Sequence, residues 1–315
     1  MDDNDIKDTN IISSGYLDVG DNHSIYYVDW GNKNIEIPIF HLHGGPGAGF
    51  SKDNFSNFDP KRHRVIFHDQ RGSGRSRFSS PFSNNTSWDL VSDICKLRKH
   101  LGFDKISLYG FSWGSTLALL YSIENPNIVE KMLIGGVFLA REIDIKFYIG
   151  GGGASTHFPE VWQRFRDNAP IHEKLDIKPH FLQELLSSKN EDQKKRFARE
   201  WLVYESSLFQ LDFTGKNLES ELEDFASESV VFLEAHYILN KCFLKENYIL
   251  DNAYKIKHIP ITIVHGRYDF ICMPSAAYEL KKALDEETIL HFVTSGHSNG
   301  DMVQREVVKA YLNFY

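Results

Sequence analysis

The sequence predicts an α/β fold, in which a mostly parallel central sheet is flanked by helices and interrupted by an inserted helical domain. Short apolar runs alternate with helical periodicity over residues 1–138 and again over residues 252–315. Strands that alternate with helices form βαβ units and a largely parallel sheet. Residues 139–251 show helical periodicity and high charge density instead. We therefore expect one sheet-containing domain, made of 1–138 and 252–315, and a helical cap at 139–251.

The first part of the chain contains several apolar runs with the length of strands. They lie at residues 24–29, 35–42, 64–68, 105–109 and 131–137. Residues 86–101 and 115–124 have helical periodicity. Thr86 stands at the start of the first helix, where its side-chain oxygen can accept a hydrogen bond from an unpaired backbone N–H group.

The middle part opens with four consecutive glycines at 150–153, which predict a flexible turn. Helical periodicity follows at residues 180–186, 191–209 and 218–243. These helices could instead continue the α/β domain, but the lack of strand-like runs favours a cap. The third part resumes the earlier pattern, with strands expected at 259–265 and 288–293 and a closing helix at 302–313.

Composition and charge narrow the classes of function. The chain has 315 residues and a net charge of −8, which argues against nucleic acid and anionic membranes as partners. No apolar run is long enough to span a bilayer, and the acidic residues 1–5 do not resemble a signal peptide. The three cysteines lack the spacing of a disulfide framework or a zinc site. We expect a cytoplasmic protein without a metal, another cofactor or an obligate protein partner.

A candidate nucleophile lies between an expected strand and an expected helix. Residues 106–117 run from a strand through Gly110-Phe111-Ser112-Trp113-Gly114, a G-x-S-x-G pattern, into a helix. A serine on such a strained turn requires small residues two positions away, because strand and helix approach closely there. Gly110 and Gly114 meet that requirement, and Ser112 would stand at a helix N-terminus, where negative charge is favoured. The strand–turn–helix order disfavours the alternative, an ordinary glycine-rich turn.

A nucleophilic serine needs a base, and the base needs an acid that orients it. In the α/β-hydrolase fold the acid and then the histidine follow the serine, each in a loop after a late strand. Asp269 follows one late strand, and His297 lies in a loop of small residues after the next. The sequence therefore predicts Ser112, Asp269 and His297 as a catalytic triad within an α/β-hydrolase fold. Asp285 is a reserve candidate for the acid, although it lies in a charged run at the end of a helix.

Acyl transfer also requires an oxyanion hole. In this fold one backbone N–H comes from the residue after the nucleophile, here Trp113, and another from a loop after an early strand. The segment His43-Gly44-Gly45-Pro46-Gly47 fits that loop, so we expect Gly44 or Gly45 to supply the second donor. His41 and His43 could also be read as a metal pair, but no third ligand is suitably spaced.

Together these motifs resemble those of the proline iminopeptidases, which are α/β hydrolases with a helical cap. The resemblance extends from about residue 15 to residue 310. Its motifs are HGGPG at 43–47, DQRGSGRS at 69–76, GFSWG at 110–114, HGRYD at 265–269 and GHS at 296–298. The first two are more specific than G-x-S-x-G and separate this family from most lipases and esterases.

The resemblance also implies how a substrate is held. The family binds the free α-amino group of an N-terminal proline with two cap glutamates, which match Glu205 and Glu234. A buried amine needs nearby carboxylates to offset its desolvation. Without the resemblance, both glutamates would be interpreted as solvated residues of helices. The family's hydrophobic pocket for the proline ring matches Phe138, Tyr148 and Ile238.

These observations support one leading hypothesis and two alternatives. The leading hypothesis is a serine aminopeptidase that releases N-terminal proline from short peptides through an acyl-enzyme. The second keeps the triad under a diverged cap, as an esterase, a lactonase or a broader aminopeptidase. Ile238 stands where the family commonly has Phe, and Lys146 and Tyr204 stand where it has Trp. The third is a silent binding protein on a hydrolase scaffold, which the complete triad disfavours.

Overall fold

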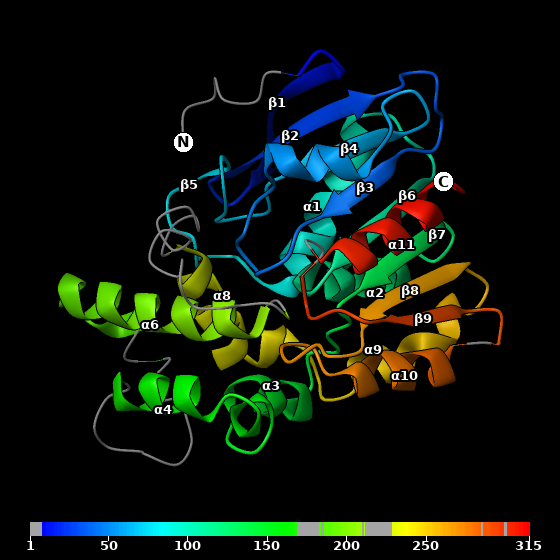
Figure 1. The fold of residues 1–315 in the computed structure, drawn as a ribbon. Coiled ribbons are helices and arrows are strands. Elements are labelled where there is room, and N and C mark those ends of the chain that lie inside the picture. The colour runs from blue at the N-terminus through cyan, green and yellow to red at the C-terminus, as the bar shows by residue number, and fades with distance from the viewer. Residues whose placement is uncertain are drawn as a thin grey trace.

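One mixed β-sheet forms the centre of the molecule (Figure 1). Its strands are β1 (Ile11–Gly20), β2 (His23–Gly31), β3 (Ile39–Leu42), β4 (Arg64–His68), β5 (Arg77–Phe78), β6 (Ile106–Phe111), β7 (Val129–Gly135), β8 (Ile261–Gly266) and β9 (Ile289–Val293). They are ordered β1-β2-β4-β3-β6-β7-β8-β9, with β5 paired to β2. The computed structural model describes residues 8–168, 183, 186–209, 211, 229–284, 286–298 and 301–315.

Most of the sheet is parallel, as predicted. The pairs β4–β3, β3–β6, β6–β7, β7–β8 and β8–β9 are parallel, whereas β2 pairs antiparallel with β1, β4 and β5. The α/β fold class is thereby confirmed. The predicted strand at 35–42 was wrong at its start, since β3 begins at Ile39, directly after Pro38, which has no N–H to donate to a neighbouring strand.

Helices cover both faces of this sheet (Figure 1). One face is covered by α1 (Ser87–His100), α2 (Trp113–Glu124) and α10 (Pro274–Ala283), and the other by the 3₁₀ helix η1 (Lys52–Asn57) and α11 (Met302–Leu312). Separate apolar clusters fill the two interfaces, with Ile94 and Leu117 in the first and Phe55 and Val308 in the second. The sheet is therefore buried on both sides, which parallel sheets require.

The helix predicted at 86–101 is observed as α1, and its predicted cap is confirmed. The Thr86 hydroxyl oxygen accepts a hydrogen bond from the Asp89 N–H at 3.3 Å. In return, the Thr86 N–H donates to the Asp89 carboxylate at 2.9 Å. This reciprocal pair satisfies two backbone groups that would otherwise lack a partner at the start of the helix.

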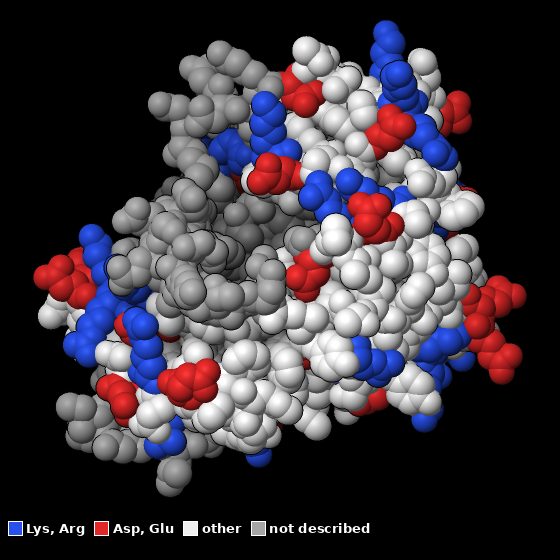
Figure 2. Space-filling view, viewed as in Figure 1, with Lys and Arg blue, Asp and Glu red and all other residues white. Residues whose placement is uncertain are grey.

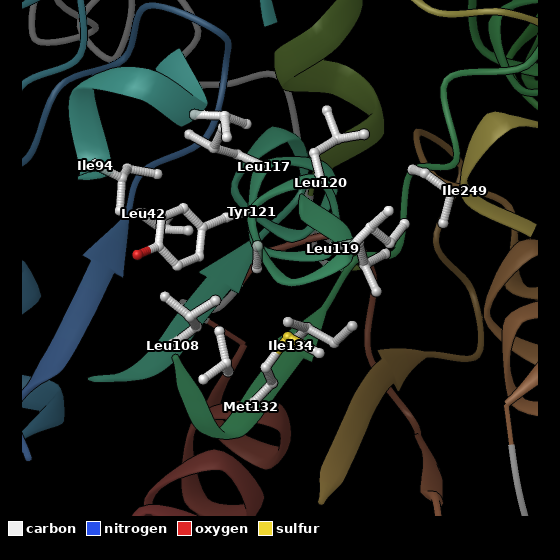
Figure 3. Packing of buried hydrophobic residues seen from close by; sticks show 14 of the residues in the cluster. Leu42, Ile94, Leu108, Leu117, Leu119, Leu120, Tyr121, Met132, Ile134 and Ile249 are labelled. Carbon is white, nitrogen blue, oxygen red and sulfur yellow. The ribbon is translucent and has the colours of Figure 1, made fainter. Parts of the chain in front are cut away.

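Helix α2 is buried along almost its whole length. Every residue from Trp113 to Ile123 is buried, and Leu117 and Tyr121 belong to the apolar cluster that also contains Leu108 of β6 and Met132 of β7 (Figure 3). A helix that is apolar on all sides belongs inside a core. Because Ser112 immediately precedes α2, the start of this helix gives it a rigid support.

The regular structure described within 139–251 is helical. It comprises α3 (Glu142–Ile149), η2 (Ala154–Thr156), α4 (Pro159–Asn168), α6 (Glu191–Phe209), α8 (Ser229–Leu239), η3 (Lys241–Phe243) and α9 (Tyr248–Asn252). The prediction for 191–209 is confirmed by α6. Of the predicted helices at 180–186 and 218–243, residues 180–182, 184, 185 and 218–228 lie outside the described residues.

The predicted helix at 218–243 was wrong at its end. Helix α8 stops at Leu239, because Lys241, Cys242 and Phe243 have φ angles of 51°, 51° and 57°. These left-handed values do not continue a right-handed helix. Periodicity alone does not reveal such a stop, because the apolar side chains continue beyond it.

Aromatic side chains join α3, α4 and α6, which lie near α8 beyond the carboxyl ends of the parallel strands (Figure 1). Tyr204 stacks on Phe165 with ring centroids 4.9 Å apart. The Tyr204 hydroxyl donates to the Tyr148 carbonyl oxygen at 2.6 Å, and the Trp201 indole N–H donates to the Tyr148 hydroxyl at 3.1 Å. These contacts fix the position of Tyr148.

The outer surface carries charges of both signs. Basic and acidic side chains are interspersed over the face shown in Figure 2. A nucleic-acid backbone is bound by a basic stripe or patch, rather than by charges that alternate in sign. None of the helices in the described ranges has both the length and the apolar character needed to cross a lipid bilayer.

Candidate active site

Ser112 occupies a strained turn between β6 and α2. Its backbone angles are φ 56° and ψ −129°, and a positive φ is uncommon for a residue with a side chain. Hydrogen bonds on both sides of Ser112 hold the turn. The Ser112 N–H donates to the Gly135 carbonyl at 3.0 Å, and the Ser112 carbonyl accepts from the Ser115 N–H at 2.8 Å and the Ser115 hydroxyl at 2.7 Å.

The glycines around Ser112 are required by close backbone packing. A Cβ atom at Gly114 would lie 2.1 Å from the Leu42 carbonyl oxygen, and one at Gly110 would lie 2.3 Å from the Gly114 carbonyl oxygen. Real Cβ contacts do not approach so closely, so even alanine does not fit at either position. This is the steric reason for the glycines in the G-x-S-x-G pattern.

His297 and Asp269 form a buried hydrogen-bonded pair. The His297 Nδ1 lies 2.8 Å from the Asp269 Oδ2, and the N–H groups of Ile271 and Cys272 donate to the Asp269 Oδ1 at 2.9 and 2.8 Å. An ionised carboxylate only accepts hydrogen bonds, so Nδ1 of His297 carries the proton. The imidazole is thus held in the tautomer that leaves Nε2 available as a base.

The histidine loop is held by the end of helix α6. The backbone N–H groups of His297 and Ser298 both donate to the Phe209 carbonyl oxygen, at 3.1 and 3.0 Å. The Phe209 ring also meets the His297 ring edge to face, with centroids 5.2 Å apart. Ser112 lies close to the same loop, because a Cβ at Gly136 would lie 3.1 Å from His297 Cε1 and 3.2 Å from the Ser112 nitrogen.

The electrostatics of the pair shift both pKa values toward the charged forms of His297 and Asp269. Burial alone would lower the pKa of His297, but Asp269 and Glu205 reverse that effect and raise the pKa above its ordinary value. Burial alone would also raise the pKa of Asp269, but His297 and the hydrogen bonds to the carboxylate hold it below its ordinary value. The opposite shifts reflect mutual stabilisation of the two charges.

The loop that contains Gly44 and Gly45 lies beside Ser112. A Cβ at Gly44 would be 3.5 Å from the Ser112 Cβ, and the Gly45–Pro46 peptide bond is cis. Among the described residues, no hydrogen bond uses the backbone N–H of Gly44 or Gly45. The Trp113 N–H is in the first turn of α2, where intrahelical partners do not exist. The three predicted oxyanion donors thus lie close to the serine and lack helix or sheet partners.

Most of the predicted site residues line one pocket. It is lined by Gly45, Pro46, Ser112, Trp113, Phe138, Ile145, Tyr148, Glu205, Glu234, Tyr237, Ile238, Cys242, Ile271 and Cys272. Of the predicted residues, Gly44, Asp269 and His297 do not line it, although Gly44 and His297 lie close to Ser112 as described above. The reserve acid, Asp285, lies outside the described residues.

Two carboxyl groups face this pocket from different helices. Burial raises the pKa of Glu205, on α6, to about 7. Burial and the neighbouring Glu205 raise the pKa of Glu234, on α8, well above its ordinary value, although hydrogen bonds from Tyr148 and Trp201 oppose this. The Glu234 Oε2 is buried without a hydrogen-bond partner. The pair therefore forms a largely enclosed site, with Glu234 buried and Glu205 half-buried, that a cationic group would satisfy.

Several pocket residues were not found from the sequence. Tyr237, Cys242, Ile145 and Ile271 line the pocket, but as apolar or weakly polar residues they give no signal distinct from ordinary core. Trp201 does not line the pocket but hydrogen-bonds to Glu234, and it offered one signal, since it lies four residues before Glu205 and so on the same helix face. Among the described residues, no group of three or more His, Cys, Asp or Glu side chains is arranged to hold a metal ion.

Comparisons with known proteins agree with this architecture. The model of a family described as "alpha/beta hydrolase fold" matches residues 37–301. The esterase from Exiguobacterium antarcticum has a similar fold, with a TM-score of 0.66 at 20% identity over 96% of this chain and 99% of that one. At that identity the likeness concerns the fold alone.

Sequence relatives are more specific. A proline iminopeptidase from Arabidopsis thaliana is 37% identical over 300 residues, which cover 95% of this chain and 78% of the relative. One from Neisseria gonorrhoeae is 39% identical over 286 residues, which cover 90% of each chain. The chain therefore belongs to the proline iminopeptidase family of α/β hydrolases.

Proposed function

We propose that the protein is a cytoplasmic serine aminopeptidase that releases N-terminal proline from short peptides. The observation that carries the proposal is the pair formed by Glu234, which is buried, and Glu205, which is half-buried, in the pocket that also contains Ser112. Glu205 also contributes to the raised pKa of His297, so this carboxylate is near the proposed base. Because an α-amino nitrogen is only two bonds from the adjacent carbonyl carbon, an amine bound there brings the first peptide bond of a substrate to Ser112.

The proposed organisation has two parts. Residues 1–138 and 252–315 form the catalytic domain, and residues 139–251 form the cap. Helices α6 and α8 of the cap contribute the two glutamates, while Ser112 follows a strand of the catalytic domain. Substrate recognition and bond cleavage are therefore assigned to different parts of the chain that meet at one pocket.

The proposed acylation step uses Ser112, His297 and Asp269. The Ser112 oxygen bonds to the prolyl carbonyl carbon while its proton passes to Nε2 of His297. The carbonyl electron pair moves onto the oxygen, where the N–H groups of Trp113 and of Gly44 or Gly45 stabilise it. The carbon–nitrogen bond then breaks, and the proton on His297 passes to the leaving amine. Asp269 orients the imidazole and stabilises its charged form.

Deacylation follows the same path with water as the nucleophile. His297 removes a proton from water, whose oxygen bonds to the acyl carbon. Collapse of this second tetrahedral intermediate breaks the ester bond, returns the proton to the Ser112 oxygen and releases proline. Phe138, Tyr148 and Ile238 line the pocket beside the glutamates and contact the apolar face of the proline ring in this proposal.

The requirement for a free amine gives the first test. L-Prolyl-β-naphthylamide is expected to be hydrolysed at least about 100-fold more efficiently than its N-acetylated form, because an acetylated nitrogen carries no charge to pair with the two carboxylates of the pocket. The measurement is kcat/KM for each substrate. Equal turnover of the two would reject the amine-binding role of the glutamates. Efficient hydrolysis of simple acyl esters without prolyl-amide activity would favour an esterase.

Neutralising one carboxyl group gives the second test. Glu205→Gln and Glu234→Gln are each expected to raise KM for prolyl-β-naphthylamide by roughly 30-fold, since an ionic hydrogen bond becomes a neutral one. In the native enzyme KM should fall as the pH rises through about 7, where Glu205 ionises, and Glu205→Gln should remove this dependence.

The matched control is Glu200→Gln in the same helix. Glu200 pairs with Arg164 at 2.7 Å and does not line the pocket. The KM of Glu200→Gln should therefore stay near the native value. If Glu200→Gln raised KM as much as Glu205→Gln, the effect would come from the helix rather than from the amine site.

A further inference from the structure

The DQRGSGRS segment at 69–76 has no role in the reaction described above, yet much of it is buried. The Asp69 carboxylate accepts hydrogen bonds from the N–H groups of Phe50 and Arg75, both at 2.8 Å, and from the Arg75 guanidinium at 2.8 Å. Asp69 therefore organises the loop around itself. Gln70, the next residue, is 3% exposed.

Gln70 bridges the two segments that carry the proposed oxyanion donors. Its side-chain Nε2 donates to the His43 carbonyl oxygen at 2.9 Å. Its side-chain Oε1 accepts from the Trp113 indole N–H at 3.1 Å. The bonded residues are 27 and 43 positions away along the chain. A single amide thus joins the loop after β3 to the start of α2.

The bond to His43 acts on the peptide unit of a proposed donor. The His43 carbonyl and the Gly44 N–H belong to the same planar peptide unit, in which the two groups of a trans bond point in opposite directions. Anchoring the carbonyl oxygen on Gln70 therefore directs the Gly44 N–H away from Gln70. Gly44 is also the residue whose Cβ would lie 3.5 Å from the Ser112 Cβ.

The backbone of Gln70 holds the same loop through the His43 ring. The Gln70 N–H donates to His43 Nε2 at 3.0 Å, and His43 Nδ1 lies 2.9 Å from the Gly44 carbonyl oxygen. Because the backbone N–H can only donate, Nε2 is the acceptor and Nδ1 carries the proton that is donated to Gly44. Burial lowers the pKa of His43 to about 4, so the neutral ring that this arrangement needs persists at neutral pH.

At the other end of the bridge, the Trp113 side chain is 1% exposed. Its ring meets the Tyr237 ring edge to face, with centroids 4.8 Å apart, and its indole N–H is bound by Gln70. With the ring held on both sides, the peptide N–H of Trp113 has little freedom to turn at the start of α2. The bridge thus restrains both proposed donors.

We propose that Gln70 is a positioning residue that sets the spacing between the two backbone donors of the oxyanion hole. This inference rests on the proposed serine-hydrolase mechanism. Donors that are already oriented when negative charge forms on the carbonyl oxygen stabilise the transition state without reorganisation. Gln70 itself does not line the pocket, so its effect falls on the developing oxyanion and not on ground-state binding of the amine or the ring.

The test uses Gln70→Met, which keeps an unbranched side chain of similar length but removes both hydrogen bonds, and Gln70→Glu, which keeps only an acceptor. Both are expected to lower kcat for prolyl-β-naphthylamide by roughly 10- to 100-fold with KM changed less than about threefold. Complete loss of one oxyanion donor costs about 100- to 1,000-fold, and displaced donors should cost less. A normal kcat in folded Gln70→Met and Gln70→Glu would overturn the proposal.

Two inhibitors separate oxyanion positioning from general damage to the pocket. L-Prolinal can form a tetrahedral adduct with Ser112. The Ser112 oxygen bonds to the aldehyde carbon, the serine proton moves to His297, and the former carbonyl oxygen becomes negatively charged. L-Prolinol presents the same amine and ring but cannot form this adduct. Gln70→Met should raise the inhibition constant of prolinal by the same factor by which it lowers kcat. The inhibition constant of prolinol should not change. Equal weakening of both inhibitors would overturn the proposal.

Ser73→Ala is the matched control within the same loop. The Ser73 hydroxyl donates to the Gln70 carbonyl at 2.7 Å and lies 3.3 Å from His43 Nε2. It contacts neither the Gln70 side-chain amide nor Trp113, and the Gln70 N–H still binds His43 without it, so kcat of Ser73→Ala should stay within about threefold of the native value. A double-mutant cycle of Gln70→Met with Trp113→Phe, which removes the indole N–H, should be non-additive because both changes break one bridge. Additive effects would show that the two residues act separately and would overturn the bridge.

An incorrect proposal of proline specificity can be distinguished from an incorrect proposal for Gln70. If the native enzyme does not hydrolyse prolyl amides, two other rates can be measured instead: kcat for p-nitrophenyl acetate and the rate of labelling by a fluorophosphonate. Any acyl or phosphonyl transfer at Ser112 uses the same oxyanion donors. Gln70→Met should lower both rates in a protein with the melting temperature of Ser73→Ala. Unchanged rates would overturn the bridge, whatever the substrate is.

Discussion

Replacing Ser112 with alanine is expected to lower kcat for prolyl-β-naphthylamide by at least about 10⁴-fold, because no other group in the triad can form the acyl-enzyme. The fold should survive. Alanine has the same Cβ at φ 56° as serine, and the backbone bonds that hold the turn, from Ser112 to Gly135 and from Ser115 to Ser112, do not use the Ser112 side chain. The measurements are kcat and covalent labelling by a fluorophosphonate.

Ser122→Ala is the control for this experiment. Ser122 is also buried in α2, but its hydroxyl donates to the Ala118 carbonyl at 2.8 Å and does not line the pocket. Its kcat and labelling should match those of the native enzyme. Labelling of Ser112→Ala at the native rate, or a kcat within tenfold of native, would assign the nucleophile to another residue.

Replacing His41 with phenylalanine is expected to protect the protein against acid. His41 lies between aromatic rings, with centroid distances of 5.1 Å to Phe67 and 5.5 Å to Tyr109, so phenylalanine suits the site sterically. The buried His41 Nδ1 has no hydrogen-bond partner. Burial lowers the pKa of His41 to about 3, with His43 and His68 adding to the effect.

The sign of the pH effect follows from this pKa. As the pH falls below about 6.5, the unfolded chain takes up a proton on His41 while the folded chain does not, so the native protein loses stability until the pH reaches about 3. At about 2.3RT for each pH unit, the loss at pH 4 is about 3 kcal/mol from this residue alone. His41→Phe removes this loss, and the stability gap between variant and native protein should grow by that amount between pH 8 and pH 4.

Chemical denaturation at several pH values measures this gap. The value at pH 8 provides the baseline for any change in packing, since His41 is neutral there in both states. Phe58→Leu is a matched control, because Phe58 packs edge to face against His41 and does not titrate. Its cost in stability should be the same at every pH. If the difference in stability between His41→Phe and the native protein were also the same at every pH, the buried His41 ring would accept a proton without unfolding of the protein.

Features set by local backbone constraints were the ones that the sequence predicted best. The turn at Ser112 was recognisable because Gly110 and Gly114 are needed where strand and helix nearly touch. Helix α6 was predicted to the residue because its apolar positions recur along one face. In contrast, β1 was missed because it is a partly exposed edge strand with few buried side chains, so its pattern lacks the apolar alternation of the inner strands.

The composition of the pocket depends on contacts that sequence does not display. Glu205 and Glu234 were singled out only by family resemblance, since glutamates on helices are usually solvated. The structure adds what distinguishes them, namely their place in one pocket, the repulsion that Glu205 exerts on Glu234, and the hydrogen bonds that Glu234 accepts from Tyr148 and Trp201. The contacts of Gln70 could not be foreseen either, because its partners are distant in the chain and meet only through the packing of β3, β6 and α2.

The way in which α6 ends has a consequence for how the enzyme can evolve. Glu205 and Phe209 are one helical turn apart, about 6 Å along the axis, and the Phe209 carbonyl supports the loop of His297. A mutation that tilts or slides α6 to admit a different amine would therefore also move His297, the proposed general base. Changes of specificity in this protein should arise through side chains that line the pocket, such as Ile238, rather than through displacement of the cap helix.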